Sequence, residues 1–257
     1  MISPSAIVHP DAKVPRSAEI GPFCVVGEHV RIGERAKLLA HVVVTGRTTI
    51  GDDVEIHPFA SIGAPSQDRK ASENELVYTT IGDRTVIREY VSIHRPSAEA
   101  GTLTSIGTDC LLLAYVHVAH NCRVGDFVTM SNMAQIAGHV VVESHASIGA
   151  MAGIHQFVRV GAHAFVGGYS KLTRDLPPFV LAEGNPIEVH GLNSVGLRRA
   201  GFSREALAEL KDAYKTLYRS GLNLSQAVAE LRPNAHSDEG RALLAFLEAP
   251  SERGILK

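Results

Sequence analysis

Residues 20–38 read IGPFCVVGEHVRIGERAKL, and an aliphatic side chain recurs there at every sixth position, in Ile20, Val26, Ile32 and Leu38. The same phase runs from Ile2 to Ile62, resumes from Ile81 to Ile93 and continues from Ile106 to Leu172. A period of six is neither that of an α-helix nor the alternation of a simple strand. It is typical of hexapeptide β-helices, in which short strands wrap around a solenoid. We therefore predict a mainly β fold, a parallel β-helix in which three hexads form one triangular coil of 18 residues.

Two breaks in the phase, near residues 63–80 and 94–105, are polar and rich in turn-forming residues. They predict excursions from the solenoid, and loops on a rigid scaffold are where function is usually carried.

The repeat fades after Leu172, so we expect a β-helix domain over residues 1–190 and a helical domain over 191–257. In the second domain Ser203 has the character of an N-cap, and apolar residues follow at helical spacing until Gly221. Two shorter helices are expected near 225–231 and 238–248.

Composition excludes several classes of protein. A formal charge of -2 argues against nucleic-acid binding, which needs a concentrated positive field. No stretch reaches the apolar length of a membrane span, and the first residues lack the charged and apolar parts of a signal peptide. We expect a cytoplasmic protein without stable membrane insertion. The three cysteines, Cys24, Cys110 and Cys122, lack CxxC spacing and occupy the small-residue position of the repeat, so they are predicted core residues.

Histidines form a column in the predicted solenoid. His120 and Gly138 are one coil apart, and Gln156 lies one coil further on. His139 and His155 are each within one position of this column, so the three histidines are expected within roughly 10 Å on one wall, given strands about 4.8 Å apart. His117 lies beside the same corner, where it could bind substrate or support His120. By contrast, His94, His145 and His163 lack this clustering and are expected to be structural.

The histidine column suits acyl transfer to a hydroxyl group. Such a reaction needs a base for the hydroxyl proton, a role that suits the imidazole of His120. It also needs a donor for the developing oxyanion, which an unobstructed backbone N–H at Gly138 could supply. The sequence has no GxSxG motif and places no base beside Ser131 or a cysteine, so direct transfer without a covalent acyl-enzyme is the simpler expectation. It also has no P-loop, so a nucleotide would need another kind of site.

Several segments resemble those of the UDP-N-acetylglucosamine acyltransferase family, hexapeptide-repeat enzymes that begin lipid A synthesis. They are Ile93–Arg95 (IHR), Val116–Cys122 (VHVAHNC), Ala137–Val140 (AGHV), Ile154–Phe157 (IHQF), Gly184–Pro186 (GNP) and Leu197–Ala206 (LRRAGFSREA). The resemblance covers essentially the whole chain. It implies a left-handed β-helix, a homotrimer with active sites between subunits, and transfer of an (R)-3-hydroxyacyl group from acyl carrier protein to the glucosamine 3-hydroxyl of UDP-N-acetylglucosamine. It implies no cofactor, because phosphopantetheine arrives on the carrier protein.

The same resemblance assigns residues. It implies His120 as general base and Gly138 as oxyanion donor, and Gly168 as the position that sets acyl length, where glycine suggests a longer chain. The implied substrate contacts are Asp68, Lys70, His117, His139, His155, Gln156, Asn193 and Arg199. Asn121, Val195 and Ala200 depart from residues expected at their positions. A group of basic residues late in the chain would complement an acidic carrier protein. The group contains Arg159, Lys171, Arg174, Arg198, Arg199 and Arg204.

Three alternatives compete with this interpretation. A zinc-dependent carbonic anhydrase or hydrolase on the same solenoid could use His120, His139 and His155 as ligands. The related N-acyltransferase carries an additional N-terminal nucleotide-binding domain, whereas hexads here start at Ile2. An ice-binding scaffold would show repeated threonine ranks rather than a histidine column. The sequence is compatible with more than one acyl chain length and with an acceptor sugar that carries either a 3-hydroxyl or a 3-amino group.

Overall fold

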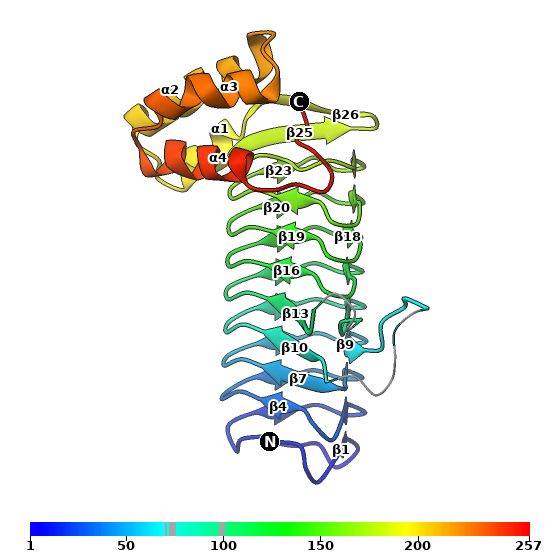
Figure 1. Ribbon diagram of the computed structural model, residues 1–257. Helices are drawn as coiled ribbons and strands as arrows, with labels where there is room; N and C mark the ends of the chain where they lie inside the picture. Colours follow the sequence, from blue (N-terminus) through cyan, green and yellow to red (C-terminus); the bar gives the residue numbers. More distant parts are fainter. Residues whose placement is uncertain (70, 72–75, 98–100) are drawn as a thin grey trace.

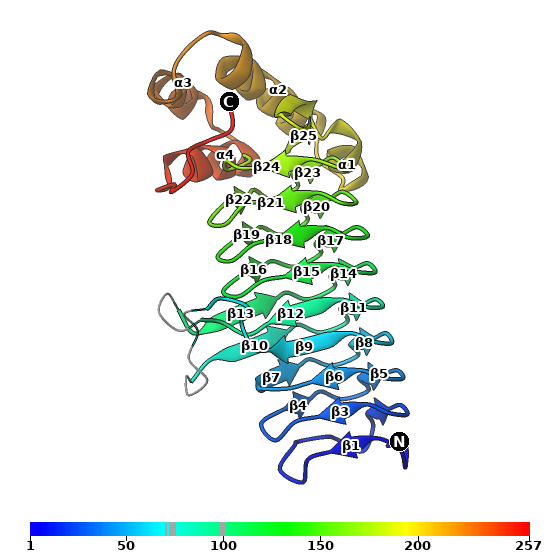
Figure 2. The ribbon, with the colours of Figure 1, turned by 90° about the vertical axis from the view of Figure 1, so that its right-hand side faces the viewer.

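The computed structural model describes residues 1–69, 71, 76–97 and 101–257, and it shows a tall triangular solenoid with a helical cap at its C-terminal end (Figure 1). The solenoid has three faces, each covered by one sheet. Sheet 1 contains β1 (Ile7–Val8), β3 (Val25–Val26), β6 (Val43–Val44), β9 (Ser61–Ala64), β12 (Ser92–His94), β15 (His117–Val118), β18 (Gln135–Ile136), β21 (Gly153–Ile154) and β24 (Lys171–Leu172). Figure 2 presents this face.

The other two faces are built in the same way. Sheet 2 contains β4 (Arg31–Ile32), β7 (Arg47–Ile50), β10 (Tyr78–Ile81), β13 (Leu103–Ile106), β16 (Arg123–Val124), β19 (Val141–Val142) and β22 (Arg159–Val160). Sheet 3 contains β2 (Glu19–Ile20), β5 (Lys37–Leu38), β8 (Glu55–Ile56), β11 (Val86–Ile87), β14 (Leu111–Leu112), β17 (Thr129–Met130), β20 (Ser147–Ile148), β23 (Phe165–Val166), β25 (Val180–Gly184) and β26 (Ile187–Leu192).

The register of the strands follows the period of the sequence. His117 pairs with Gln135, which pairs with Gly153, so in these coils the partner residue lies one coil further along the chain with no register shift. The aliphatic residue of each hexad points inward, and Ile20, Leu38, Ile56, Ile87 and Leu112 are at most 2% exposed. All three cysteines are buried and free, as the repeat predicts. The two predicted excursions occur where pairing jumps, from Ser61 to Ser92 and from Ser92 to His117.

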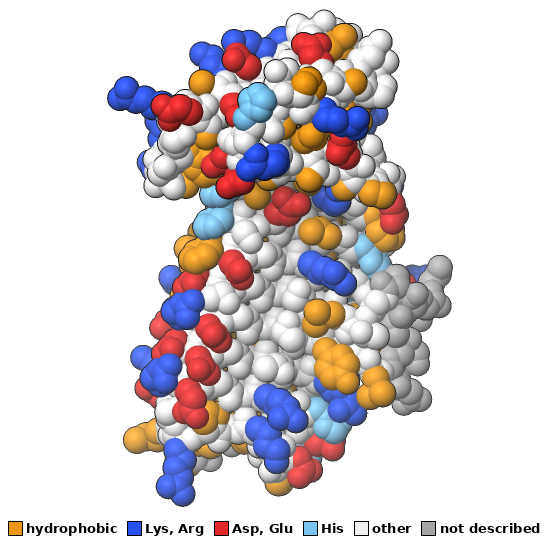
Figure 3. Space-filling model, turned by 60° about the vertical axis from the view of Figure 1, so that its left-hand side comes forward, with side chains coloured by type: hydrophobic (Ala, Val, Ile, Leu, Met, Phe, Trp, Pro, Cys, Tyr) orange, Lys and Arg blue, Asp and Glu red, His pale blue; other side chains and the backbone are white. Residues whose placement is uncertain are grey.

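Three corners, which differ in the side chains they carry, join the sheets. The histidine corner, between sheets 1 and 2, contains residues 119–122, 137–140 and 155–158. The ion-pair corner, between sheets 2 and 3, carries the Arg35–Asp53 and Arg84–Asp109 bridges of 2.6 and 2.8 Å. Figure 3 shows acidic and basic side chains adjoining along one edge of the solenoid. The apolar corner, between sheets 3 and 1, carries Phe23, His41, Phe59, Tyr90, Tyr115, Met133, Met151 and Tyr169.

The cap begins with an antiparallel hairpin, β25–β26, which extends sheet 3. Four helices follow: α1 (Ser194–Arg199), α2 (Arg204–Arg219), α3 (Leu224–Leu231) and α4 (Asp238–Glu248), with the 3-10 turn η2 (Arg232–Asn234). Ser203 caps α2 by accepting a hydrogen bond from the Ala206 N–H, as the sequence predicts. None of the helices in the described ranges is both long and apolar enough to cross a membrane.

An ion pair ties the cap to the last coils of the solenoid. The Asp175 carboxylate is fully buried and accepts hydrogen bonds from the backbone N–H and the Nε of Arg159, at 2.8 and 2.7 Å. The Arg159 guanidinium lies 4.3 Å from the centre of the Phe246 ring in α4. Arg159 is therefore an anchor of the cap, and its expected place in a carrier-docking surface is wrong because its charge is already paired and mostly covered.

Candidate functional site

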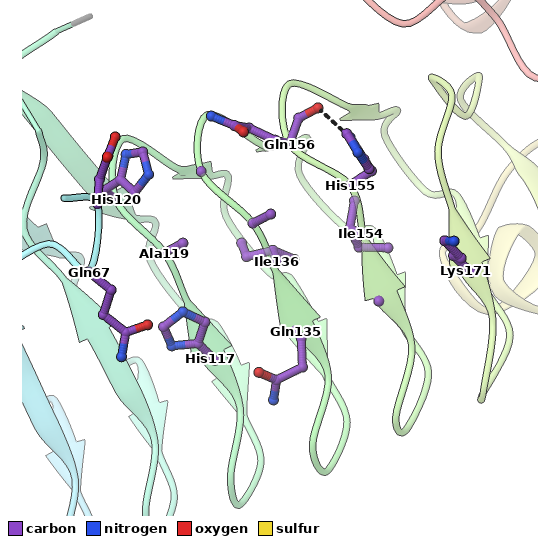
Figure 4. Close-up of a pocket in the computed structure, with 14 residues that line it drawn as sticks. Gln67, His117, Ala119, His120, Gln135, Ile136, Ile154, His155, Gln156 and Lys171 are labelled. Carbon is purple, nitrogen blue, oxygen red and sulfur yellow. Dashed lines mark hydrogen bonds between the residues drawn. The ribbon is translucent and has the colours of Figure 1, made fainter. Parts of the chain in front are cut away.

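A cavity of about 600 Å³ opens on sheet 1 beside the histidine corner, and the first excursion forms one of its walls. Its polar lining residues are Gln67, Asp68, His117, His120, Gln135, His155, Gln156 and Lys171. Figure 4 shows how the coils present these groups: His117 and Gln135 project from neighbouring strands, whereas His120 and Gln156 stand on the corner turns. The strict register thus converts residues one coil apart into neighbours along one wall.

His120 and Gly138 are in direct contact in this cavity. A Cβ atom added to Gly138 would lie 2.5 Å from both Cε1 and Nε2 of His120, so only glycine leaves room for the ring. Gly138 is buried, and within the described part of the chain its N–H donates to no acceptor. Because Gly138 lines the cavity, its N–H is available to donate to a ligand bound there. The predicted pairing of His120 with Gly138 is therefore present in the geometry.

Asn121 fixes the hydrogen-bonding state of His120. Its Nδ2 donates to the Gly101 carbonyl at 2.8 Å, which orients the amide. Its Oδ1 accepts from the Ser97 N–H at 3.0 Å and lies 2.9 Å from Nδ1 of His120. Because Oδ1 can only accept, Nδ1 of His120 carries the proton and Nε2 of the neutral ring has a free lone pair. This lone pair faces the Gly138 side of the cavity.

The neighbouring histidines stay neutral. Burial, with smaller effects from His94 and His120, lowers the pKa of His117 to about 4, and its Nδ1 is 2.8 Å from the Ser92 hydroxyl. Burial and the nearby His120 also lower the pKa of His139. The His139 ring contacts His120 edge-on, with centroids 5.1 Å apart, and stacks on Phe157 at 4.6 Å. His117 and His139 are therefore uncharged near neutral pH.

The structure brings most of the predicted substrate contacts together. His117, His120, Gly138, His155 and Gln156 line one cavity, with Asp68 entering from the first excursion, and His139 is in ring contact with His120. Lys70 lies outside the described residues. Gln67, Gln135 and Lys171 also line the cavity. No motif of the sequence predicts them there, and Lys171 was expected only in the basic group that complements a carrier protein. The hexad register could have identified Gln135 and Lys171, because each is in the same column of sheet 1 as His117.

Three other predicted residues lie elsewhere in the chain. Asn193 caps α1 and donates from Nδ2 to the His163 carbonyl at 3.0 Å, so it belongs to the ion-pair corner. Arg199 lies in the last turn of the same helix. Gly168 lies at the apolar corner, beside a separate cavity of about 380 Å³. A single chain therefore does not combine these three positions with the His120 cavity.

Of the three histidines expected to lie outside the His120 column, His94 adjoins it and the other two stack at another corner. His94 is 8% exposed, and its ring lies edge-on to that of His117 with centroids 5.1 Å apart. His145 and His163 stack on each other at 4.5 Å in the ion-pair corner, between Phe127 on one side and Phe179 and Phe202 on the other. His94 therefore adjoins the His120 column, contrary to expectation, because the excursion changes the spacing there. His145 and His163 stack on each other because they are one coil apart, but they lie at another corner, outside that column as expected.

A regular hexapeptide solenoid with a histidine cavity on one corner and a helical cap defines a hexapeptide-repeat acyltransferase. Residues 29–64 match the family model for bacterial transferase hexapeptide repeats, and residues 175–256 match the second domain of the UDP-N-acetylglucosamine O-acyltransferase model. The chain is 46% identical over 261 residues to the acyl-[acyl-carrier-protein]–UDP-N-acetylglucosamine O-acyltransferase of Burkholderia orbicola, covering 100% of this chain and 99% of that one. The protein belongs to this O-acyltransferase family.

Solved structures of relatives agree with this assignment. The structure of LpxA from Acinetobacter baumannii has a TM-score of 0.95 and 39% sequence identity to this chain, and the match covers 100% of this chain and 99% of the other. The Francisella novicida UDP-N-acetylglucosamine acyltransferase has a TM-score of 0.97 with 36% identity, covering 100% and 94%. The β-helix is therefore of the left-handed kind, as the resemblance implied.

Proposed function

We propose that this cytoplasmic enzyme transfers an (R)-3-hydroxyacyl group from acyl carrier protein to the glucosamine 3-hydroxyl of UDP-N-acetylglucosamine, the first step of lipid A biosynthesis. Family membership supports the substrate class. The observation that carries the chemistry is the contact between Nε2 of His120, with its lone pair free, and the Gly138 backbone. A base and an oxyanion donor then flank one point in the cavity, as acyl transfer to a hydroxyl requires.

In the proposed reaction, Nε2 of His120 takes the hydroxyl proton while the hydroxyl oxygen attacks the thioester carbonyl. The Gly138 N–H donates to the resulting oxyanion. The tetrahedral intermediate collapses, the C–S bond breaks, and the phosphopantetheine thiolate takes the proton back from His120. Asn121 holds the ring throughout by its Oδ1, although it lacks the charge with which a carboxylate would stabilise the imidazolium.

Direct transfer is favoured over a covalent acyl-enzyme. Among the lining residues that the structure describes there is no serine, threonine or cysteine. The cysteines lie inside the solenoid, where burial raises the pKa of Cys110 to about 11 and that of Cys122 to about 12. A thiol in such a state is a poor nucleophile at neutral pH.

We propose that the working enzyme is a homotrimer in which adjacent copies complete each site. The apolar corner forms a continuous ridge of stacked or adjoining side chains, and Phe23, Tyr115 and Tyr169 are 58%, 49% and 75% exposed. Exposed apolar ridges of this length mark association surfaces. If three ridges meet on a threefold axis, sheet 1 of one copy faces sheet 3 of the next. The His120 cavity then lies opposite the corner that carries Asn193 and Arg199.

The test is to incubate the protein with UDP-N-acetylglucosamine and a panel of 3-hydroxyacyl carrier proteins, and to identify products by mass. We expect O-acylated nucleotide sugar from the wild type and from His29→Ala, a control on the exposed N-terminal coil. His120→Ala should lose at least about 10²-fold in kcat, the usual contribution of a general base. Gly168→Met should shift the preference to shorter donors.

The same assay separates the proposed function from the zinc alternative. Activity that is unchanged by a chelator or by added zinc supports the acyltransferase mechanism. An absence of acylated product with every donor, together with zinc-dependent hydration or hydrolysis that requires His120, His139 and His155, would replace it.

A further inference from the structure

His94 links the first excursion to the wall of the catalytic cavity. Its Nδ1 is 2.6 Å from the backbone carbonyl of Pro65, at the start of that excursion. A carbonyl only accepts hydrogen bonds, so Nδ1 of His94 carries a proton and donates it. Side chains this well buried rarely leave a polar atom unpaired, and this bond satisfies one of the two ring nitrogens.

The other side of His94 contacts a cavity residue. Its ring lies against that of His117, with centroids 5.1 Å apart and planes at 71°. His117 is held from a second direction by Ser92, its register partner on β12, whose hydroxyl is 2.8 Å from Nδ1. His117 therefore has its orientation set jointly by two residues of β12, one of which is His94.

Pro65 is close in sequence to the part of the excursion that enters the cavity. Gln67 and Asp68 follow it within three residues, and both line the cavity. The turn they form is ordered locally, because the Asp68 N–H donates to the Ser66 hydroxyl at 3.1 Å and the Ala71 N–H donates to the Asp68 carbonyl at 3.0 Å. A displacement of Pro65 would be passed to Gln67 and Asp68 through this short, ordered turn.

The strand pairing makes His94 the natural attachment point. The register between β9 and β12 shifts between Ile93 and His94, so that His94 pairs with Ala64. The Arg95 N–H donates to the Ala64 carbonyl at 2.9 Å, which continues the pairing one residue beyond the regular strand. The two excursions thus leave the solenoid side by side, and His94 lies between them and the cavity.

We propose that His94 is a positioning residue for acyl transfer, which holds the Gln67–Asp68 turn and the His117 ring in the geometry that the sugar nucleotide requires. This inference rests on the proposed function, since it assigns a role within that cavity. His94 touches no reacting atom in this scheme. Its effect should therefore appear mainly in the binding of UDP-N-acetylglucosamine, with a smaller effect on the chemical step.

The experiment compares His94→Leu, which keeps similar volume without a donor, with His94→Asn, whose amide N–H can replace Nδ1–H. Full kinetics for both substrates are measured on each purified full-length variant, together with its melting temperature. His94→Leu is expected to raise KM for UDP-N-acetylglucosamine about tenfold, the loss equivalent to one well-formed hydrogen bond, with kcat reduced less than about threefold. His94→Asn should recover KM to within about threefold of wild type. His29→Leu is the matched control.

The inference is overturned if His94→Leu has wild-type kinetics, or if it lowers stability and all kinetic constants together while His94→Asn does no better. Either result would make His94 a packing residue only. Failure of the wild type to acylate the sugar nucleotide would instead remove the proposed function, and this inference with it. An active wild type with insensitive His94 variants removes the inference alone.

Discussion

At the scale of single residues, the amide of Asn121 determines which nitrogen of His120 can accept a proton. Its two anchors, the Ser97 N–H and the Gly101 carbonyl, come from the second excursion and fix the amide from opposite sides. The backbone of Asn121 has a φ of 60°, in the left-handed region that asparagine tolerates better than most residues. Position 121 therefore needs a residue that tolerates a positive φ and whose side chain both donates and accepts hydrogen bonds.

Asn121→Asp should change the pH profile of the reaction. A carboxylate beside Nδ1 favours the protonated imidazole, so the acidic limb of kcat/KM should move to higher pH by about one unit. The second carboxylate oxygen would face the Gly101 carbonyl, so a lower melting temperature should accompany the shift. The profile is measured between pH 5 and 9 with the wild type alongside. An unmoved acidic limb would mean that His120 does not carry the observed titration.

His163 should make the stability depend on pH. Burial, and to a lesser extent His145, lowers its pKa to about 4 in the folded protein. In the unfolded chain a histidine titrates near 6.5, so the unfolded state binds more protons between these values. The contribution of His163 is therefore present above about pH 6.5 and is lost as the pH falls toward 4. Thermal unfolding at a series of pH values measures this loss.

The matched variant for that measurement is His163→Asn. Asparagine does not titrate, and it accepts the φ of 55° found at this position. Its melting temperature should be lower at pH 7, because ring stacking is lost, but should fall less steeply between pH 6.5 and 4. Equal slopes in the variant and the wild type would assign the acid sensitivity to other groups. His236→Asn, in the exposed part of the cap, serves as control.

At the scale of elements, the Arg159–Asp175 pair joins β22 to α4 and the C-terminal segment. Asp175→Ala would leave the partly buried Arg159 charge without its carboxylate, and we expect a loss of about 3 kcal/mol in unfolding free energy. Chemical denaturation followed by circular dichroism measures it. Asp53→Asn, which removes the charge of an exposed pair but tolerates the φ of 56° at this position, should leave the midpoint nearly unchanged. Equal effects would show that the buried pair does not hold the cap.

The sequence predicted the elements of the solenoid because the hexad period acts locally. Each inward residue, such as Leu112 or Ile136, is determined by its own coil and the two beside it. The N-cap at Ser203 was likewise predictable, since capping depends on a few consecutive residues. The β25–β26 hairpin and the short α1 were not, because no repeat covers them and their pairing depends on sheet 3 already being formed.

At the scale of the whole molecule, the period also predicted much of the site. It predicts that His120, Gly138 and Gln156 stack along one corner, and the three residues line one cavity. It could not predict the contact of His94 with His117, which depends on how far the excursions displace the register. Nor could it bring Asn193 and Arg199 to the cavity, because these residues lie on another corner of the same chain.

That separation makes a prediction about assembly. If each site takes its cavity from one copy and Arg199 from the next, His120→Ala and Arg199→Ala damage different halves of a shared site. In any ring of three that mixes the two variants, the cyclic order leaves one site with both halves intact. Co-expression with two affinity tags isolates such rings. They should show about a third of wild-type activity, whereas each variant alone shows little.

The control pairs His120→Ala with Gly138→Ala, whose added Cβ would collide with the His120 ring. Both changes damage the cavity half, so mixing them restores no site, and activity should stay at the level of the separate variants. Recovery by this pair would mean that His120 and Gly138 of one copy do not act in the same site. If the first pair also fails to recover while the rings remain trimeric, Arg199 acts within its own chain or not at all.

Met133→Lys, on the exposed apolar ridge, should disperse the trimer and abolish activity although every site residue is intact. The reason is that the cavity of one copy and Arg199 of the next then never meet.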